Sequence, residues 1–220
     1  MININRITSY SEWEQACYRE IESVILSNSE KKNIALSGGS TPIPIYQRIG
    51  ELLETLPKSI KKGVRFFLVD ERDVSIESSR SNSAMIMNTI GRDFVVPFDP
   101  RELSPEAYYR KMCQELDITD VFDLVVLGCG EDGHTASLFP KTSLLIEKST
   151  SFMKNQLPSG ELRYSMTFSL INSAKKRVVF VNDNTNKKKY FNTAFLKARS
   201  HPIHNVLSTP NTQVIIHEAL

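Results

Sequence analysis

The chain has 220 residues, of which 40% are hydrophobic and 24% are charged, as is typical of a single globular domain, residues 1–220. Its formal net charge of +2 gives no reason to expect nucleic acid or a membrane surface as a partner. No apolar stretch approaches the roughly 18 residues of a membrane-spanning helix, and no signal-peptide pattern opens the chain, so we expect a cytoplasmic protein.

In the first half of the chain, short apolar runs alternate with segments of helical period. Apolar runs at 34–36 and 64–69 predict strands, and amphipathic segments at 11–26, from 42, from 81 or 82 through 90, and at 104–116 predict helices. Ser40 or Thr41 is the expected N-cap of the second helix, with Pro42 in its first turn.

The second half continues the alternation. We expect strands at 121–126, 163–171, 178–181, 205–207 and 214–216, a helix at 187–199, and a loop or short helix over 141–160. Strands that alternate with helices in this way favour a mostly parallel α/β sandwich.

A turn with three glycines follows the apolar run 121–126, which reads as a strand buried on both faces. Ligands of open α/β sheets bind at the carboxyl ends of the strands, and His134 comes immediately after this turn. An imidazole there is well placed to move a proton. Residues 128–133 also match the G-x-G-x-x-G dinucleotide pattern, but Pro140 interrupts the helix that this site needs, and position 153 is Met rather than acidic.

A second polar loop, 38–42, lies between a predicted strand and a predicted helix start. Its N–H groups and the hydroxyls of Ser40 and Thr41 can form an anion cradle, which the helix dipole favours. A tight turn with an N-cap is the simpler alternative. The loop is not a Walker A motif, so a phosphate monoester fits it better than a nucleoside triphosphate. Arg72 follows the next strand at the same edge of the sheet.

The remaining charged and metal-binding side chains give weaker signals. Arg163 and the lysines at 187–189 are surface charge or a weak nucleic-acid patch, and no interleaved aromatic residues support the latter. His201 and His204 lack further ligands nearby in the sequence, and the three cysteines form no Cys-x-x-Cys pair. We therefore expect no metal, no cofactor and no nucleic-acid partner.

Together these motifs resemble the 6-phosphogluconolactonase family. The resemblance rests on residues 36–42 (LSGGSTP), 69–74 (VDERDV), 81–82 (SN) and above all 122–140 (FDLVVLGCGEDGHTASLFP). It implies a Rossmann-like α/β fold that is shared with glucosamine-6-phosphate isomerases. It also implies a cytosolic enzyme of the oxidative pentose phosphate pathway, which hydrolyses 6-phospho-D-glucono-1,5-lactone without a metal.

The resemblance also implies roles for individual residues. By this match His134 is the general base and Asp132 the acidic neighbour that orients it. The implied substrate-binding and phosphate-binding residues are Gly38, Gly39, Ser40, Thr41, Arg72, Arg163 and Lys187. Lys188 is an alternative to Lys187, because the glycine that precedes the lysine in the family is Asn184 here. The family's Asp-Ala near the C-terminus is replaced by His217-Glu218-Ala219.

The predicted reaction is general-base hydrolysis, in which His134 takes a proton from the attacking water and N–H groups of the glycine turn bind the oxyanion. Two alternatives stay open, an isomerase or deaminase and a non-catalytic sugar-phosphate sensor. The isomerase relatives carry Phe-Asn-Glu-Pro after the histidine, whereas residues 137–140 here are Ser-Leu-Phe-Pro, so Phe139 stands where the isomerases have a proton-carrying glutamate. The expected assembly is a monomer or small homo-oligomer.

Overall fold

A six-stranded parallel sheet forms the centre of the protein. The computed structural model describes residues 2–116, 121–182 and 187–218. The strands of the main sheet, in spatial order, are β1 (Asn3–Ile7), β9 (Thr212–His217), β8 (Lys176–Asn182), β5 (Leu124–Leu127), β2 (Lys32–Leu36) and β3 (Val64–Leu68). Each neighbouring pair runs parallel. Every residue of β2 and β5 is buried, as expected for inner strands of a parallel sheet.

The winding of the main sheet reverses between β2 and β5. From β2 the chain adds β3 on one side, and it then returns to place β5, β8 and β9 on the other side. The loops that leave β2 and β5 at their carboxyl ends therefore face each other across a topological switch point. This is where open α/β sheets bind their ligands.

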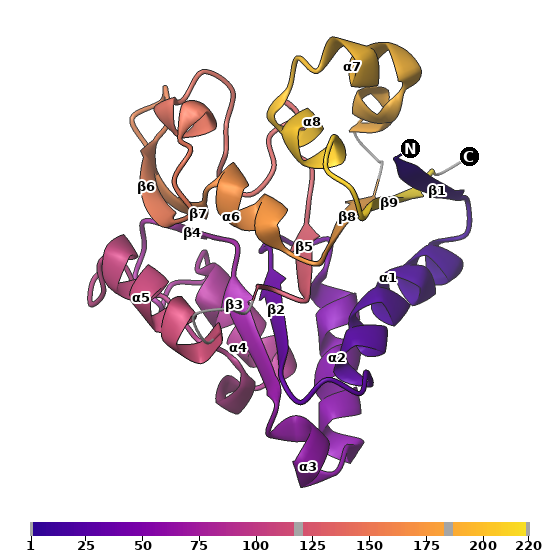
Figure 1. Cartoon of the computed structure of the whole chain (residues 1–220), viewed down its shortest axis with the longest axis vertical. Helices are drawn as coiled ribbons and strands as arrows, with labels where there is room; N and C mark the ends of the chain where they lie inside the picture. Colours follow the sequence, from indigo (N-terminus) through magenta and orange to yellow (C-terminus); the bar gives the residue numbers. More distant parts are fainter. Residues whose placement is uncertain (1, 117–120, 183–186, 219–220) are drawn as a thin grey trace.

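A small antiparallel sheet lies at the same end of the molecule (Figure 1). Its strands, in spatial order, are β4 (Asp70–Arg72), β7 (Leu162–Met166) and β6 (Phe152–Gln156). Val69 joins the two sheets, because its N–H donates to the carbonyl of Leu36 at 3.0 Å and its carbonyl accepts from the N–H of Met166 at 2.8 Å.

Helices flank the main sheet on both sides (Figure 1). The α-helices are α1 (Tyr10–Ile25), α2 (Ile43–Thr55), α3 (Lys58–Lys61), α4 (Asn82–Ile90), α5 (Pro105–Leu116), α6 (Phe168–Ser173), α7 (Thr193–Ala198) and α8 (Pro202–Leu207). Short 3₁₀ helices are η1 (Arg92–Phe94), η2 (Ser143–Ile146) and η3 (Lys187–Phe191). Helix α2 packs between α1 and α4, and α6 packs against α8. The predicted α/β sandwich with a mostly parallel sheet is confirmed.

The predicted helix starts differ in how they are capped. Ser81 caps α4 as expected, because its hydroxyl accepts a hydrogen bond from the N–H of Ala84 at 3.1 Å. The prediction that Ser40 or Thr41 caps α2 is wrong: Pro42 is the N-cap residue, and no side chain bonds to the first turn.

Several predicted elements differ from those observed. Residues 205–207 end helix α8 instead of forming a strand, and the predicted strand 163–171 ends at Met166, after which α6 begins. The predicted helix 187–199 is divided into η3 and α7, and the segment 141–160 contains strand β6 as well as η2. Strand β1, which was not predicted, lies at the edge of the main sheet, where exposed polar residues hide its pattern.

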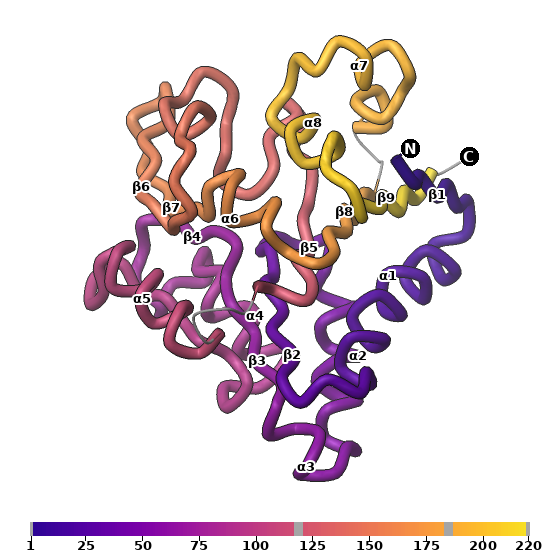
Figure 2. Tube along the Cα trace, in the orientation of Figure 1, coloured from indigo at the N-terminus to yellow at the C-terminus, as the bar shows by residue number. Residues whose placement is uncertain are grey.

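The two ends of the described chain meet in one strand pair. β1 pairs with β9 in parallel from Asn3–Gln213 to Ile7–His217, and Figure 2 shows the first and last described segments of the chain side by side. An ion pair between Arg6 and Glu218 extends this contact. The indole N–H of Trp13 donates to the carbonyl of Ile215 at 3.1 Å, which fixes α1 to the same strand.

Candidate functional site

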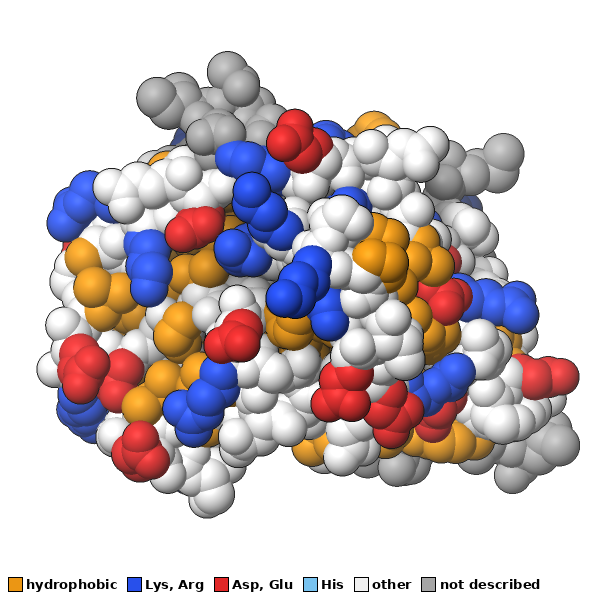
Figure 3. Space-filling model, turned by 90° about the horizontal axis from the view of Figure 1, so that it is seen from below, with side chains coloured by type: hydrophobic (Ala, Val, Ile, Leu, Met, Phe, Trp, Pro, Cys, Tyr) orange, Lys and Arg blue, Asp and Glu red, His pale blue; other side chains and the backbone are white. Residues whose placement is uncertain are grey.

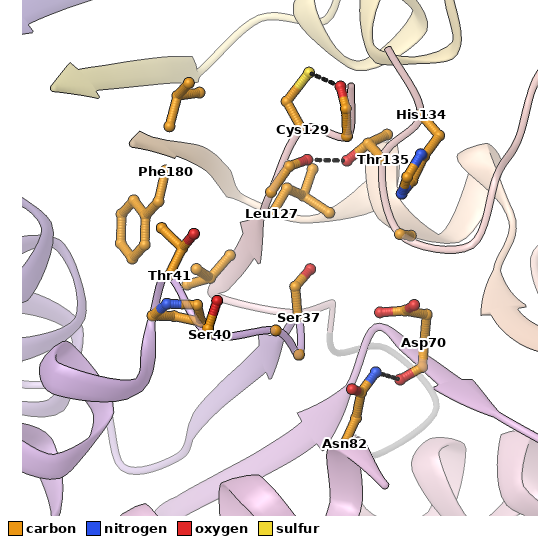
Figure 4. Close-up of a pocket in the computed structure, with 18 of the residues that line it drawn as sticks. Ser37, Ser40, Thr41, Asp70, Asn82, Leu127, Cys129, His134, Thr135 and Phe180 are labelled. Atoms are coloured by element: carbon orange, nitrogen blue, oxygen red, sulfur yellow. Dashed lines mark hydrogen bonds between the residues drawn. The ribbon is translucent and has the colours of Figure 1, made fainter. Parts of the chain in front are cut away.

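A cavity of about 270 Å³ opens at the switch point between β2 and β5. Its walls come from the loop after β2, the loop after β5, strand β4 and the start of α4 (Figure 4). The predicted site residues that line it are Gly38, Gly39, Ser40, Thr41, Arg72, His134 and Lys187. Asp132 and Arg163 do not line the cavity: Asp132 contacts His134, and Arg163 lies on β7 opposite Arg72.

The imidazole of His134 is held by Asp132. Its Nδ1 lies 2.5 Å from Oδ1 of Asp132, and the same oxygen accepts from the backbone N–H of His134 at 3.1 Å. In the neutral imidazole this contact favours the tautomer in which Nδ1 carries the proton and donates it to the carboxylate. Nε2 then has a lone pair that can accept a proton. The His134 side chain is 28% exposed and lines the same cavity as Ser40 and Arg72, so water can reach it.

The contact with His134 also changes the pKa of Asp132. Partial burial by itself raises the pKa of Asp132, but the hydrogen bond and the charge of His134 outweigh this effect and bring the pKa below its ordinary value. Asp132 is therefore an ionised partner at neutral pH, able to orient the imidazole and to stabilise its protonated form.

Two backbone N–H groups of the glycine turn donate hydrogen bonds within the turn. The N–H of Gly130 donates to the carbonyl of His134 at 2.8 Å, and the N–H of Gly133 donates to the carbonyl of Gly130 at 3.1 Å. The prediction that the N–H groups of the turn bind an oxyanion is therefore wrong for these two glycines.

The loop after β2 presents polar groups at the N-terminus of α2. Helix α2 does not use the hydroxyls of Ser40 and Thr41 as caps, and the buried hydroxyl of Ser37, which lines the same cavity, has no hydrogen-bond partner among the described residues. Gly39 has φ +97°, a left-handed conformation that glycine adopts without strain. Hydroxyls and helix N–H groups at one helix end form a site suited to an anion.

Asn82 fixes Arg72 at the cavity wall. The guanidinium of Arg72 donates to Oδ1 of Asn82 at 2.7 Å and to the carbonyl of Arg80 at 2.8 Å, while Nδ2 of Asn82 donates to the carbonyl of Asp70 at 2.8 Å. Gly38 packs directly on this amide, since a Cβ added to Gly38 would lie 1.9 Å from Oδ1 of Asn82. Asn82 was named in the sequence motif but was not predicted as a site residue.

Glu71, fully buried, joins β4 to α4. Its two carboxylate oxygens accept four hydrogen bonds of 2.7–3.0 Å, from the backbone N–H groups of Arg72, Asn82 and Ser83 and from the hydroxyl of Ser81. Burial raises the pKa of Glu71, although these donors oppose the shift. The glutamate of the Asp-Glu-Arg motif is thus a structural residue that holds Arg72 and Asn82 in register.

Asp70 lines the cavity, and sequence reasoning did not identify it as a site residue. Oδ2 of Asp70 accepts from the hydroxyl of Ser137 at 2.7 Å. Burial raises the pKa of Asp70 above its ordinary value, although the Ser137 hydrogen bond and the charge of Arg72 oppose the shift. In the sequence Asp70 is one residue of a mixed charge run, and nothing in that run marks it as buried.

Of the two other cationic residues predicted for the site, Lys187 lines the cavity and Arg163 does not. Arg163 lies opposite Arg72 in the β4–β7 register, and its guanidinium is 3.0 Å from Glu161. Lys187 lines the cavity, whereas Lys188 lines a separate depression with Arg6 and Glu218, which favours Lys187 of the two alternatives. Asn184 and Ala219 lie outside the described residues.

The C-terminal segment packs against the glycine turn that precedes His134. The hydroxyl of Tyr190 donates to the carbonyl of Glu131 at 2.6 Å, and the N–H of Ile203 donates to the carbonyl of Gly133 at 3.0 Å. His201 and His204 belong to this packing, where burial lowers the pKa of His204.

The part of the chain that the structure describes contains no group of three or more His, Cys, Asp or Glu side chains placed to hold a metal ion.

One face of the molecule carries side chains of both charges. On the face seen in Figure 3, Lys and Arg side chains lie among Asp and Glu side chains. Among the described helices, none has both the length and the apolar character to cross a bilayer.

The chain is similar to proteins of one family. A family model described as glucosamine-6-phosphate isomerases/6-phosphogluconolactonase matches residues 9–216. A probable 6-phosphogluconolactonase of Dictyostelium discoideum is 30% identical over 246 aligned positions, which cover 98% of each chain. The 6-phosphogluconolactonase of Chlamydia pneumoniae is 36% identical over 186, covering 79% of this chain and 70% of that protein. The solved structure of 6-phosphogluconolactonase from Trypanosoma cruzi superposes with a TM-score of 0.79 at 25% identity, covering 99% of this chain and 94% of that one.

Proposed function

The chain belongs to the glucosamine-6-phosphate isomerase/6-phosphogluconolactonase family, and we propose that it is a 6-phosphogluconolactonase in which His134 is the general base. It hydrolyses 6-phospho-D-glucono-1,5-lactone to 6-phospho-D-gluconate, the second step of the oxidative pentose phosphate pathway. The observation that carries the proposal is the shared cavity: an imidazole with one nitrogen held by a carboxylate faces the same space as a set of groups suited to bind an anion.

The proton moves through Nε2 of His134. Asp132 holds Nδ1, so Nε2 accepts a proton from water as the water oxygen attacks the lactone carbonyl C1. When the tetrahedral intermediate breaks its bond between C1 and the ring oxygen, the imidazolium returns the proton to that oxygen, which becomes the C5 hydroxyl. The acid that forms at C1 then ionises in solution. A lactone is already electrophilic, so no covalent intermediate is needed.

The phosphate of the substrate is bound at the other end of the cavity. The loop from Gly38 to Thr41, with Arg72 and Lys187, supplies N–H groups, hydroxyls and two positive charges, and Arg163 adds charge from the strand beside Arg72. Because the phosphate is remote from C1, its binding energy orients the reacting end of the sugar.

The test measures hydrolysis of the phosphorylated lactone above its spontaneous rate, with purified protein in the presence of a chelator. Wild-type protein is expected to accelerate the reaction, and His134→Ala is expected to lower kcat by about 10²–10⁴-fold, the usual contribution of a positioned base. Binding of 6-phosphogluconate to this variant, measured by calorimetry, should be nearly unchanged. Unchanged turnover with lost product binding would show that His134 binds substrate instead of moving the proton.

The same assays separate the alternatives. Equal activity on unphosphorylated gluconolactone would contradict the phosphate site. Binding of 6-phosphogluconate without any turnover would indicate a sugar-phosphate sensor. Turnover of glucosamine 6-phosphate in place of the lactone would indicate an isomerase or deaminase, a function that Phe139 beside His134 disfavours because a phenyl ring carries no proton.

A further inference from the structure

The imidazole of His134 stacks on the phenyl ring of Phe139. The ring centroids are 3.9 Å apart, and the ring planes meet at 23°. Aromatic rings in proteins more often lie edge to face or at larger offsets, so this is a close, face-covering contact. Phe139 thus touches the group that moves the proton, while its own ring has no chemistry to offer.

The other face of the imidazole is closed by Gly130. A Cβ added to Gly130 would lie 2.1 Å from Cε1, 2.2 Å from Nδ1 and 2.7 Å from Nε2 of His134. Distances this short to three adjacent ring atoms place that Cβ over the ring face instead of at the ring edge. The stacked phenyl ring leaves no room on its own side, so the Gly130 backbone covers the opposite side.

The backbone between the two rings forms a reverse turn that sets this contact. The N–H of Leu138 donates to the carbonyl of Thr135 at 3.0 Å, and Ala136 between them has φ +50°, an uncommon conformation for a residue other than glycine. Leu138 is fully buried, and the carbonyl of Phe139 accepts from the hydroxyl of Thr142 at 2.9 Å. The turn therefore holds the phenyl ring over the imidazole from a fixed backbone.

We propose that Phe139 is a positioning residue, which acts with Gly130 to clamp the plane of the His134 imidazole so that Nε2 points at the attacking water. Asp132 alone leaves the ring free to pivot about the hydrogen bond at Nδ1, whereas contacts on both faces remove that freedom. The inference rests on the proposed function, since it assigns the clamp to the general base of lactone hydrolysis.

The test compares Phe139→Leu, which removes the flat face, with Phe139→Tyr, which keeps it. Phe139→Leu is expected to lower kcat by about 10–100-fold with KM nearly unchanged, because small misplacement of a catalytic group costs this much. Phe139→Tyr should keep most of the wild-type kcat. Phe94→Leu, a half-buried phenylalanine in η1 away from the cavity, is the matched control for loss of a phenyl ring and should leave kcat unchanged.

A second measurement separates positioning from a general structural effect. In NMR spectra, ring-current shielding of the His134 Cε1 proton should be lost in Phe139→Leu and kept in Phe139→Tyr and Phe94→Leu. Wild-type kcat in Phe139→Leu, or an equal loss in Phe139→Tyr, would overturn the proposal. If the wild-type protein fails to hydrolyse the lactone, the proposed function is wrong, while the NMR comparison still decides whether Phe139 orients His134.

Discussion

Among single residues, Asp70 shows how burial changes the pKa of a side chain. It is a nearly buried carboxyl at the cavity wall, with one hydrogen bond from Ser137 at 2.7 Å. The residue types that carry the proposed chemistry were predictable, since His134 and the 38–41 loop each follow a strand at the same edge of the sheet. The role of Asp70 was not, because burial of a charged residue depends on which strand pairs with it.

The raised pKa of Asp70 predicts a pH-dependent cost in stability. Below about pH 4 the carboxyl is protonated in both the folded and the unfolded chain. As the pH rises, the Asp70 carboxyl ionises first in the unfolded chain because burial raises its pKa in the folded state, so the contribution of Asp70 to the free energy of unfolding falls. Asp70→Asn, which cannot ionise, should gain stability relative to the wild type between pH 4 and 7.

Urea unfolding at several pH values, followed by the fluorescence of Trp13, measures this difference. Asp93→Asn, which removes an exposed carboxyl in η1, is the matched control for the loss of one carboxyl group. A difference between Asp70→Asn and the wild type that stays constant over this pH range would contradict the effect of burial.

Between elements, the contact that matters most for the site joins the loop after β2 to the start of α4. Gly38 touches the amide of Asn82, and that amide holds Arg72. Gly38→Ala should displace Asn82 and raise the KM for the phosphorylated lactone by about 10–100-fold, as expected when a hydrogen bond to a charged group worth about 1.5–3 kcal/mol is lost.

A double-mutant cycle in steady-state kinetics checks this coupling. Asn82→Ala alone should raise KM to a similar extent, and the double variant should be no worse than Gly38→Ala, because both changes remove one contact. The kcat/KM for unphosphorylated gluconolactone should change little in all three variants. Fully additive effects on KM would show that Gly38 and Asn82 act separately.

The elements that sequence patterns missed are those set by tertiary pairing. In β6 the polar Asn155 is buried, where its amide donates to the carbonyl of Ser137 at 2.7 Å, so no alternation of apolar and polar residues marks the strand. Residues 205–207 have the apolar character of a strand, but Pro202 begins a helix there and His204 completes its cap. In contrast, β2, β3, β5 and β8 are buried on both sides and were visible as apolar runs.

At the scale of the whole molecule, hydrogen bonds and packed aromatic rings connect the small sheet to the rest of the protein. Val69 is hydrogen-bonded to both sheets, and Phe152 of the small sheet packs against Phe98 and Tyr108 with ring centroids about 5 Å apart. The expectation of one domain over residues 1–220 therefore becomes a measurable prediction.

Unfolding should be a single cooperative transition. Trp13, the only tryptophan, reports on α1 and the main sheet, far-UV circular dichroism reports on all elements, and residual lactonase activity reports on the cavity. The three probes should give coincident midpoints in urea. Loss of activity and of the β6–β7 amide protection from hydrogen exchange at lower urea than the Trp13 transition would show that the small sheet unfolds independently.

Because the winding reverses between β2 and β5, the two sides of the cavity come from different parts of the chain. The groups proposed to grip an anion come mostly from before residue 83, and those proposed to shuttle a proton come after residue 127. Neither portion contains both the anion-binding groups and the proton-transfer groups, so a fragment with only one portion is expected to have no turnover. For the same reason, substitutions confined to the loop after β5 could change the reaction while the proposed phosphate site stays intact.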